Sequence, residues 1–251
     1  MDGTLAKSLH RHFLTRRHST LLVAIVVAFV ARPMIGDIGV GPLVFSLALI
    51  VLMLVSLYTI QVDELVGERA TLLLQKRRRS IIGWLLVIPA IGDRLAIGYV
   101  HSPRLVLAGA IFWLVFFGFI TWNELRAVVK QREVTGETIA LSISVYLLLG
   151  LTWGVFYIVL YYLQPSAFNF GGSNAHLEPT QVFPVLIYFS LTTLSTVGFG
   201  DITPLTLQAR YAAVAEGITG QFYLAILVAR LVGLYMSRAT NQDIKSQSHP
   251  D

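Results

Sequence analysis

The most distinctive chemistry in this sequence lies in residues 192–201, where two glycines alternate with larger side chains. Gly198 and Gly200 can adopt a left-handed backbone without steric cost. If left- and right-handed residues alternate, successive carbonyl groups turn to the same side of the strand. Four such strands around one axis would stack rings of carbonyl oxygens, which can replace the hydration shell of a monovalent cation. The segment therefore predicts a cation-coordinating strand.

Helices must position this strand, because irregular backbone at membrane depth is tolerated only when it is buried in protein or lines a water-filled path. A transmembrane helix needs about 20 mostly apolar residues. Six runs meet this requirement, namely 19–36, 43–62, 81–99, 105–122, 138–163 and 207–232. A shorter run, 182–195, directly precedes the glycine segment. At about 14 residues, it is expected to be re-entrant rather than spanning.

The composition favours a membrane protein over a soluble one. Of 251 residues, 55% are hydrophobic and 13% are charged, whereas soluble domains average about 25% charged residues. The sequence has no cysteine, which excludes disulfides and thiolate chemistry. The basic stretch before the first run is long and no small-x-small pattern follows that run, so we do not expect a signal peptide.

The placement of the basic residues explains the net charge of +5. With the N-terminus inside, 14 of the 19 Lys and Arg residues fall on inner segments and three on outer flanks. This asymmetry predicts a multi-pass protein of the cell membrane with both termini in the cytoplasm. Nucleic acid is not needed as a partner. One basic cluster could instead bind anionic lipid: Lys76, Arg77, Arg78 and Arg79.

The centre of the glycine segment reads Thr196-Val197-Gly198-Phe199-Gly200-Asp201. It closely resembles the potassium channel filter motif, Thr-Val-Gly-Tyr-Gly-Asp or its phenylalanine variant. The resemblance extends over 183–232 and includes Pro184 opening the pore helix, Pro204 after the filter and Arg210 opening the inner helix. It implies an all-α membrane protein with six transmembrane helices, a re-entrant pore helix and a filter loop, assembled as a homotetramer.

The resemblance also assigns roles to individual residues. The ion-binding strand would consist of Thr196, Val197, Gly198, Phe199 and Gly200, with potassium at the carbonyls of the first four. Asp201 would lie at the outer mouth. Filter support would come from Tyr188, Phe189, Thr192, Thr193 and Glu216. The cavity and gate would be formed by Gly217, Gly220, Gln221, Leu224 and Val228.

Two departures from the family pattern concern the support of the filter. Phe199 replaces the commoner tyrosine, so its hydroxyl bond to the aromatic cuff is missing. Tyr188 and Phe189 occupy the cuff positions, and we expect packing to hold the filter with fewer hydrogen bonds. Thr192 stands where some relatives hold a buried acid.

Several residues of the last helix have two open interpretations. An acid is costly in hydrocarbon, so Glu216 should face protein or water. It could support the filter through Thr192 or Thr193, or make an interhelical bond without functional consequence. Gly220 could be a hinge or allow close helix packing. Gln221 could keep the ion partly hydrated or pack between helices. We expect Arg230 to extend to the membrane interface.

The first four helices lack the charge array of a voltage sensor. The fourth carries only Arg104, at its outer edge. Asp93 and Arg94 could form a structural or a functional pair, and we expect no pH-sensing or metal role for His18. The predicted divisions are a cytoplasmic N-terminal segment (1–18), an accessory bundle (19–122), an amphipathic linker helix (123–137), a pore domain (138–236) and a short cytoplasmic tail (237–251).

These features predict a potassium-selective channel that conducts passively, is not voltage-gated and needs no cofactor besides the transported ion. The sequence shows no enzymatic apparatus, since it lacks a phosphate-binding glycine loop, a metal-ligand cluster and a nucleophile paired with a base. The alternatives are a non-selective cation channel and a non-conducting receptor or regulatory subunit. The sequence does not indicate what opens the gate.

Overall fold

The computed structural model describes residues 16–35, 47–58, 103–131, 133–171, 177 and 179–247, and most of them are helical. The helices are α2 (Arg17–Ile35), a helix at Leu47–Tyr58, α5 (Pro103–Lys130), α6 (Gly136–Leu163), α7 (Pro179–Leu194) and α8 (Leu207–Gln247). A 3-10 turn, η2 (Pro165–Ala167), precedes the short strand β1 (Phe168–Asn169). This strand pairs antiparallel with β2 (Thr203–Pro204).

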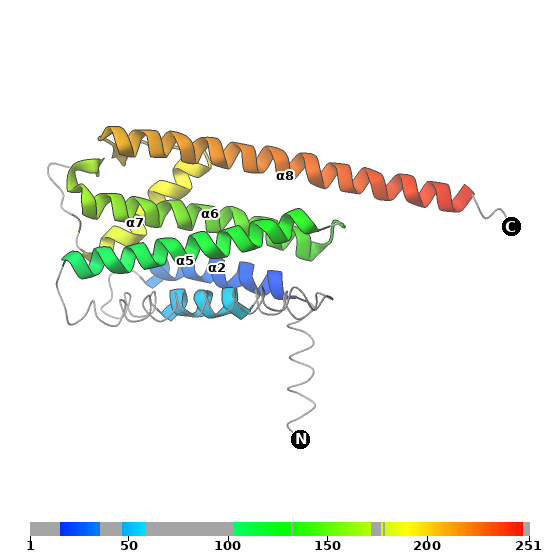
Figure 1. The fold of residues 1–251 in the computed structure, drawn as a ribbon, viewed down its shortest axis with the longest axis horizontal. Coiled ribbons are helices and arrows are strands. Elements are labelled where there is room, and N and C mark those ends of the chain that lie inside the picture. The colour runs from blue at the N-terminus through cyan, green and yellow to red at the C-terminus, as the bar shows by residue number, and fades with distance from the viewer. Residues whose placement is uncertain are drawn as a thin grey trace, which may run out of the picture.

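Helix α6 is the centre of the assembly and contacts α2, α5, α7 and α8. Residues 138–163 contain no Asp, Glu, Lys or Arg, as expected for a helix with neighbours on all sides. Figure 1 shows α7 running obliquely across α6 toward α8, and α8 extending well past the other helices. Helix α7, which leads to the glycine segment, thus packs against both α6 and α8.

Three helices in the described part are long and apolar enough to cross a membrane: Leu105–Lys130, Gly136–Leu163 and Leu207–Met236. They coincide with the predicted runs 105–122, 138–163 and 207–232. The runs 19–36 and 43–62 contain α2 and the 47–58 helix, whose described apolar parts are shorter than a span. The run 81–99, the basic cluster 76–79 and the pair Asp93 and Arg94 lie outside the described residues.

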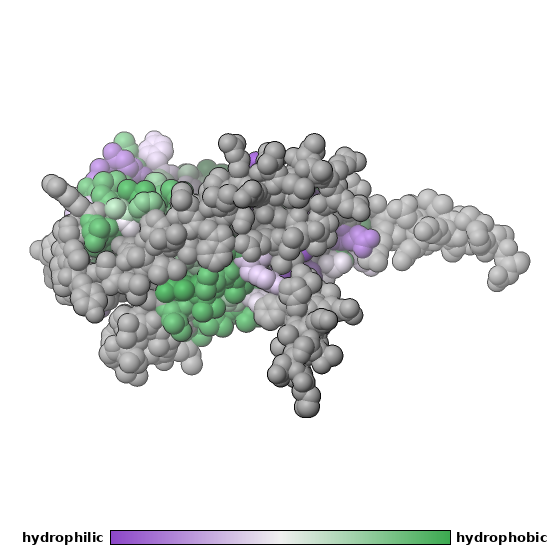
Figure 2. Space-filling model, turned by 60° about the horizontal axis from the view of Figure 1, so that its bottom comes forward, coloured by the Kyte–Doolittle hydropathy of each residue, from purple (hydrophilic) through white to green (hydrophobic). Residues whose placement is uncertain are grey.

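Large apolar side chains are exposed on the N-terminal helices. Figure 2 shows a hydrophobic patch on the face that it turns forward. On α2 and the 47–58 helix, the exposed large apolar residues are Val23, Val26, Val27, Val30, Leu47, Val51 and Leu54. Exposure of this kind is expected where lipid or another chain is the neighbour.

The predicted linker helix at 123–137 is wrong as a separate element. Helix α5 continues without a break to Lys130, because its apolar side chain Val128 packs in one cluster with Leu141 and Val145 of α6. Helix α6 then begins at Gly136. Thr135 caps it by accepting a hydrogen bond from the Thr138 backbone N–H at 3.2 Å.

The start of α7 also differs from the prediction. Pro179, not Pro184, opens the helix, and Pro184 lies inside it. A proline at the first position loses nothing, because that N–H has no partner within the helix. An interior proline removes one backbone hydrogen bond. Helix α7 tolerates this loss and begins three residues before the predicted run 182–195.

Charged residues join α2, α5 and α6 at one end of the bundle. The Glu137 carboxylate in the first turn of α6 accepts hydrogen bonds from the backbone N–H groups of His18 and Ser19, at 3.0 and 3.3 Å, and from the Ser19 hydroxyl. It thereby caps the N-terminus of α2. His18 is buried, with Nδ1 3.9 Å from Oε2 of buried Glu124 in α5.

Candidate functional site

The segment after α7 has the alternating backbone expected from its glycines. Gly198 and Gly200 have positive φ angles of 49° and 82°, which confirms the predicted left-handed conformations. Thr196 also has a positive φ, 59°, which is uncommon for a residue with a Cβ. Left-handed backbone thus recurs at every second residue from 196 to 200.

The last turn of α7 holds this segment through backbone hydrogen bonds. The Thr196 N–H donates to the Thr193 carbonyl at 3.0 Å, and the Gly198 N–H donates to the Thr192 carbonyl at 3.1 Å. Capping of helix-end carbonyls by left-handed residues is common. The Thr196 geometry was not predicted, because it follows from the turn that ends α7 and not from the residue type.

The side chains of the segment are open on a single chain. Val197 and Phe199 are 55% and 70% exposed. Tyr188 of α7 lies parallel to Phe199, with ring centroids 6.3 Å apart and planes 2° from each other. On the other side, Gln221 Nε2 of α8 donates to Thr196 Oγ1 at 3.4 Å. Gln221 therefore contacts the innermost residue of the predicted filter.

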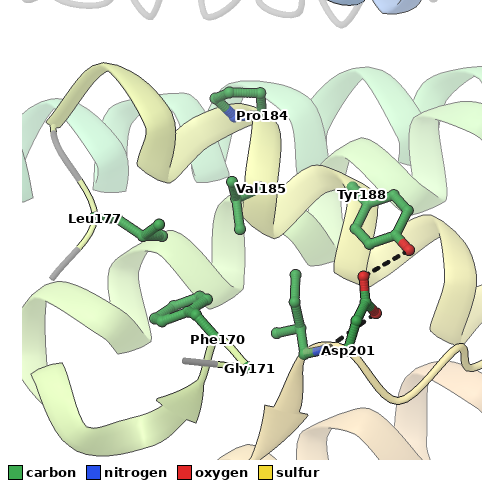
Figure 3. Close-up of a pocket in the computed structure, with 8 residues that line it drawn as sticks. Phe170, Gly171, Leu177, Pro184, Val185, Tyr188 and Asp201 are labelled. Carbon is green, nitrogen blue, oxygen red and sulfur yellow. Dashed lines mark hydrogen bonds between the residues drawn. The ribbon is translucent and has the colours of Figure 1, made fainter. Parts of the chain in front are cut away.

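Asp201 is anchored through both carboxylate oxygens. The Tyr188 hydroxyl donates to Oδ2 at 2.9 Å, and the Ile202 backbone N–H donates to Oδ1 at 3.0 Å. Figure 3 shows both bonds at the edge of a pocket. Phe199 has no hydroxyl to donate, but Tyr188 of α7, whose ring is stacked on Phe199, donates its own hydroxyl to Asp201. The sequence did not indicate this bond.

A pocket of about 550 Å³ lies beside Asp201 (Figure 3). It is lined by Phe170, Gly171, Leu177, Pro184, Val185, Tyr188, Asp201 and Ile202. The loop after α6 forms one wall, because β1 pairs with β2 and the Leu205 N–H donates to the Ala167 carbonyl at 2.8 Å. Gly171 has a φ of 73°, and a Cβ there would come within 2.9 Å of the Asp201 carbonyl oxygen. The loop thus braces the chain just after the glycine segment.

Glu216 is fully buried between the three helices α6, α7 and α8. The Tyr157 hydroxyl of α6 donates to Oε2 at 2.6 Å, and Ser190 Oγ of α7 is in hydrogen-bond contact with Oε1. The predicted bond to Thr192 or Thr193 is absent. These two hydroxyls instead donate to the Phe189 carbonyl in their own helix, as threonines in helices often do.

Two partners of Glu216 were not predicted, although the sequence holds a signal for them. Ser190 and Tyr157 are polar residues within long apolar helices, where a polar group needs a partner. Phe189, predicted to lie in the cuff, instead packs at 5.0 Å from the Tyr157 ring and 5.4 Å from the Phe168 ring. It therefore joins α7 to α6 and β1.

Gly220 allows α8 to approach the end of α7 closely. A Cβ at this position would overlap the Leu194 carbonyl oxygen and lie 3.0 Å from the Leu194 Cδ1. At Gly217, a Cβ would lie 3.8 Å from the Thr193 carbonyl oxygen, which is an ordinary contact. Helix α8 runs through Gly220 as one α-helix. The geometry supports the close-packing interpretation of Gly220.

From Leu224 to Arg230, α8 carries exposed apolar side chains and also binds α5. Leu224 and Val228 are 38% and 59% exposed. Arg230 binds the C-terminal end of α5. Its guanidinium donates to the carbonyls of Val129 and Gln131, both at 2.6 Å, because carbonyls at the C-terminal end of a helix lack partners within the helix.

Comparison with known proteins assigns this chain to a family. Residues 145–237 match the family model described as "Ion channel". Over 71 residues, the chain is 35% identical to potassium channel protein kcv of Paramecium bursaria Chlorella virus 1. The aligned region covers 28% of this chain and 76% of that protein. The chain belongs to the potassium channel superfamily. The matched region of the family model contains α7, the glycine segment and most of α8.

Other similar proteins are also named potassium channels. This superfamily member is 25% identical over 178 residues to the voltage-gated potassium channel Kch of Escherichia coli (strain K12), covering 67% of this chain and 41% of Kch. It is 33% identical over 104 residues to two-pore potassium channel 4 of Arabidopsis thaliana, and the alignment covers 41% of this chain and 33% of that protein. The chain thus spans less than half the length of either relative. No solved structure matches it.

Proposed function

We propose that the protein conducts potassium ions selectively and passively across the cell membrane. The carrying observation is the alternation of left-handed backbone at Thr196, Gly198 and Gly200, directly after the C-terminal end of α7. Such alternation directs carbonyls to one side, and the C-terminal end of a helix favours a cation. The names of the relatives support potassium as the ion.

In this proposal, the residues have the roles that the resemblance implies. The carbonyls of Thr196, Val197, Gly198 and Phe199 coordinate potassium, together with the Thr196 hydroxyl. Asp201 adds negative potential at the outer mouth. Gln221 keeps the entering ion partly hydrated, which its bond to Thr196 Oγ1 supports.

A closed pore needs four copies, because one chain supplies one filter strand. The exposed side chains of Val197 and Phe199 support this, since a filter strand packed on one side only needs neighbours. So do large exposed side chains along α8: Tyr211, Val214, Ile218, Phe222 and Ile226. A mass of four chains in mild detergent is the expected result.

The proposed orientation puts both chain termini in the cytoplasm, following the distribution of basic residues. Residues 76–79 would then face the inner leaflet, where they can attract anionic lipid. Proteolysis of sealed vesicles from one side tests the orientation. Cleavage of both termini only from the outside of right-side-out vesicles would contradict it.

The test of function is the reversal potential of the purified protein in planar bilayers under bi-ionic potassium and sodium conditions. A potassium-selective reversal potential supports the proposal. Equal permeability would indicate a non-selective cation channel. Absence of any flux from correctly assembled protein would indicate a regulatory subunit.

Gly198→Ala should abolish selective current, because a Cβ opposes its left-handed backbone. Gly233→Ala is the matched control, since a Cβ at this glycine of α8 would meet nothing within 4 Å. The control should keep the parent reversal potential. Full potassium selectivity in Gly198→Ala would contradict the role of the glycine segment.

A further inference from the structure

The buried acid Glu216 of α8 joins this helix to α6 and to α7 near the C-terminal end of α7. Glu216 is 0% exposed. Its two carboxyl oxygens meet the Tyr157 hydroxyl from α6 and Ser190 Oγ from α7. Ser190 lies one turn before Leu194, the last residue of α7. A change in the protonation or hydrogen bonding of this carboxyl group therefore acts on the last turn of α7, which leads into the filter.

The number of protons at Ser190 identifies the state of this acid. Ser190 Oγ lies 2.7 Å from the Gly150 carbonyl oxygen and also contacts Glu216 Oε1. A serine hydroxyl has one proton to donate. The Gly150 carbonyl only accepts, and so does an ionised carboxylate. Two hydrogen bonds along this row of three oxygens need two protons, so the second proton belongs to Glu216.

The charges around Glu216 agree with a neutral acid. Residues 138–163 of α6, all of α7 and both residues of β2 contain no Asp, Glu, Lys or Arg. The ionisable side chains of α6 that interact with Glu216 are Tyr146 and Tyr157. Tyr188 of α7 is bonded to Asp201 instead. On α8, Arg210 donates to the Pro204 carbonyl and Arg230 to the end of α5.

An ionised Glu216 would therefore be a buried charge without an ion partner among these elements. Such a charge is unfavourable even when it accepts hydrogen bonds. With the proton in place, Glu216 donates to Ser190, Ser190 donates to Gly150, and Tyr157 donates to Glu216. All three contacts are then satisfied.

We infer that Glu216 is a protonated carboxylic acid in the conducting conformation, and that loss of its proton to water destabilises the filter from behind. This inference rests on the proposed function. After ionisation, the single Ser190 proton cannot serve both Gly150 and Glu216, so α7 loses one bond to α6 or to α8. The Gly198 N–H is bonded to the Thr192 carbonyl in the last turn of α7, which transmits the change to the filter.

Single-channel recording of the full chain in planar bilayers tests the inference. The measurement is open lifetime in symmetric potassium chloride, with pH varied on both sides from about 5 to 9.5, a range in which buried glutamic acids can ionise. The parent should show a three- to tenfold shorter open lifetime at the alkaline end, about the effect of one hydrogen bond.

Glu216→Gln separates the proton from the carboxyl shape. Its amide N–H can donate to Ser190 and its oxygen can accept from Tyr157, so openings should stay long at every pH. Ser190→Ala removes the shared hydroxyl and should give short openings without the alkaline change. Thr219→Ala is the control, because the Thr219 hydroxyl donates to Ala215 in its own helix. It should retain the parent pH dependence.

Retention of the alkaline change in Glu216→Gln, or its absence in the parent, would overturn the inference. Infrared difference spectroscopy of parent against Glu216→Gln adds a measurement that needs no conduction. At neutral pH, the parent alone should show the C=O stretch of a protonated carboxyl group. A missing band would overturn the protonated state, whereas a band without potassium flux would overturn the proposed function only.

Discussion

At the scale of single residues, the support of the glycine segment comes from a few contacts made by small or polar side chains. Tyr188 anchors Asp201, Gln221 contacts Thr196, and Gly220 admits the carbonyl end of α7. Each contact joins residues far apart in the sequence. Substitutions at such positions therefore report on packing around the glycine segment and not on local helix formation.

Gly220→Ala distinguishes close packing from a hinge. We expect destabilisation of about 1–3 kcal/mol, the usual effect of overpacking, because the new Cβ overlaps the Leu194 carbonyl oxygen. Thermal denaturation of the assembled protein is the measurement. Gly217→Ala, on the same helix with an ordinary 3.8 Å contact, should change stability little. A stable Gly220→Ala protein with reduced opening would favour the hinge instead.

At the scale of elements, α2 and α5 are bonded to α6 and α8 at two helix ends. Glu137 of α6 caps α2, and Arg230 of α8 caps α5. The buried His18 and Glu124 pair links α2 to α5 at the same end of the bundle. A movement of α2 or α5 would therefore reach both α6 and α8 through these hydrogen bonds and the His18–Glu124 contact.

Arg230→Gln should weaken the attachment of α5 to α8. Hydrogen bonds from charged groups contribute about 1.5–3 kcal/mol, so we expect a lower denaturation temperature and a changed open probability. Arg230→Lys keeps a cationic donor and should restore part of both. If Arg230→Gln matches the parent in stability and open probability, the contact carries no coupling.

At the scale of the whole molecule, the sequence of the predicted fourth helix offers few charges that could respond to voltage. One charge crossing the membrane field gains about 2.3 kcal/mol per 100 mV, and steep gating needs roughly 3–4 charges in each of four subunits. Residues 105–121 of α5 contain no Asp, Glu, Lys or Arg. Arg104 alone lies at the beginning of the helix.

We therefore predict weak or absent voltage gating. Open probability in symmetric potassium should vary only shallowly from about −120 to +120 mV, a range worth about 5.5 kcal/mol for each charge that crosses the field. A sigmoidal curve that requires several charges per channel would contradict this prediction. Such a curve would assign voltage sensing to helices whose sequences carry no charge array.

Sequence patterns predicted the apolar helices α5, α6 and α8, the left-handed glycines 198 and 200, and the family. These features are local, since they depend on hydropathy over one helix length and on residues that lack a Cβ. The limits of elements were less predictable. The end of α5 and the start of α7 depend on packing against α6 and on the tolerance of Pro184 within a helix.

The partners of the buried polar groups could not be predicted, because they depend on how the helices pack. Glu216 could reach Thr192 or Thr193 by sequence position, but those hydroxyls donate to Phe189 in their own helix, whereas Ser190 and Tyr157 face Glu216. Arg230 binds the C-terminal end of α5, a partner that its sequence position does not indicate. Helix rotation and crossing set these partners, and both result from packing of whole faces, which no short stretch of sequence specifies.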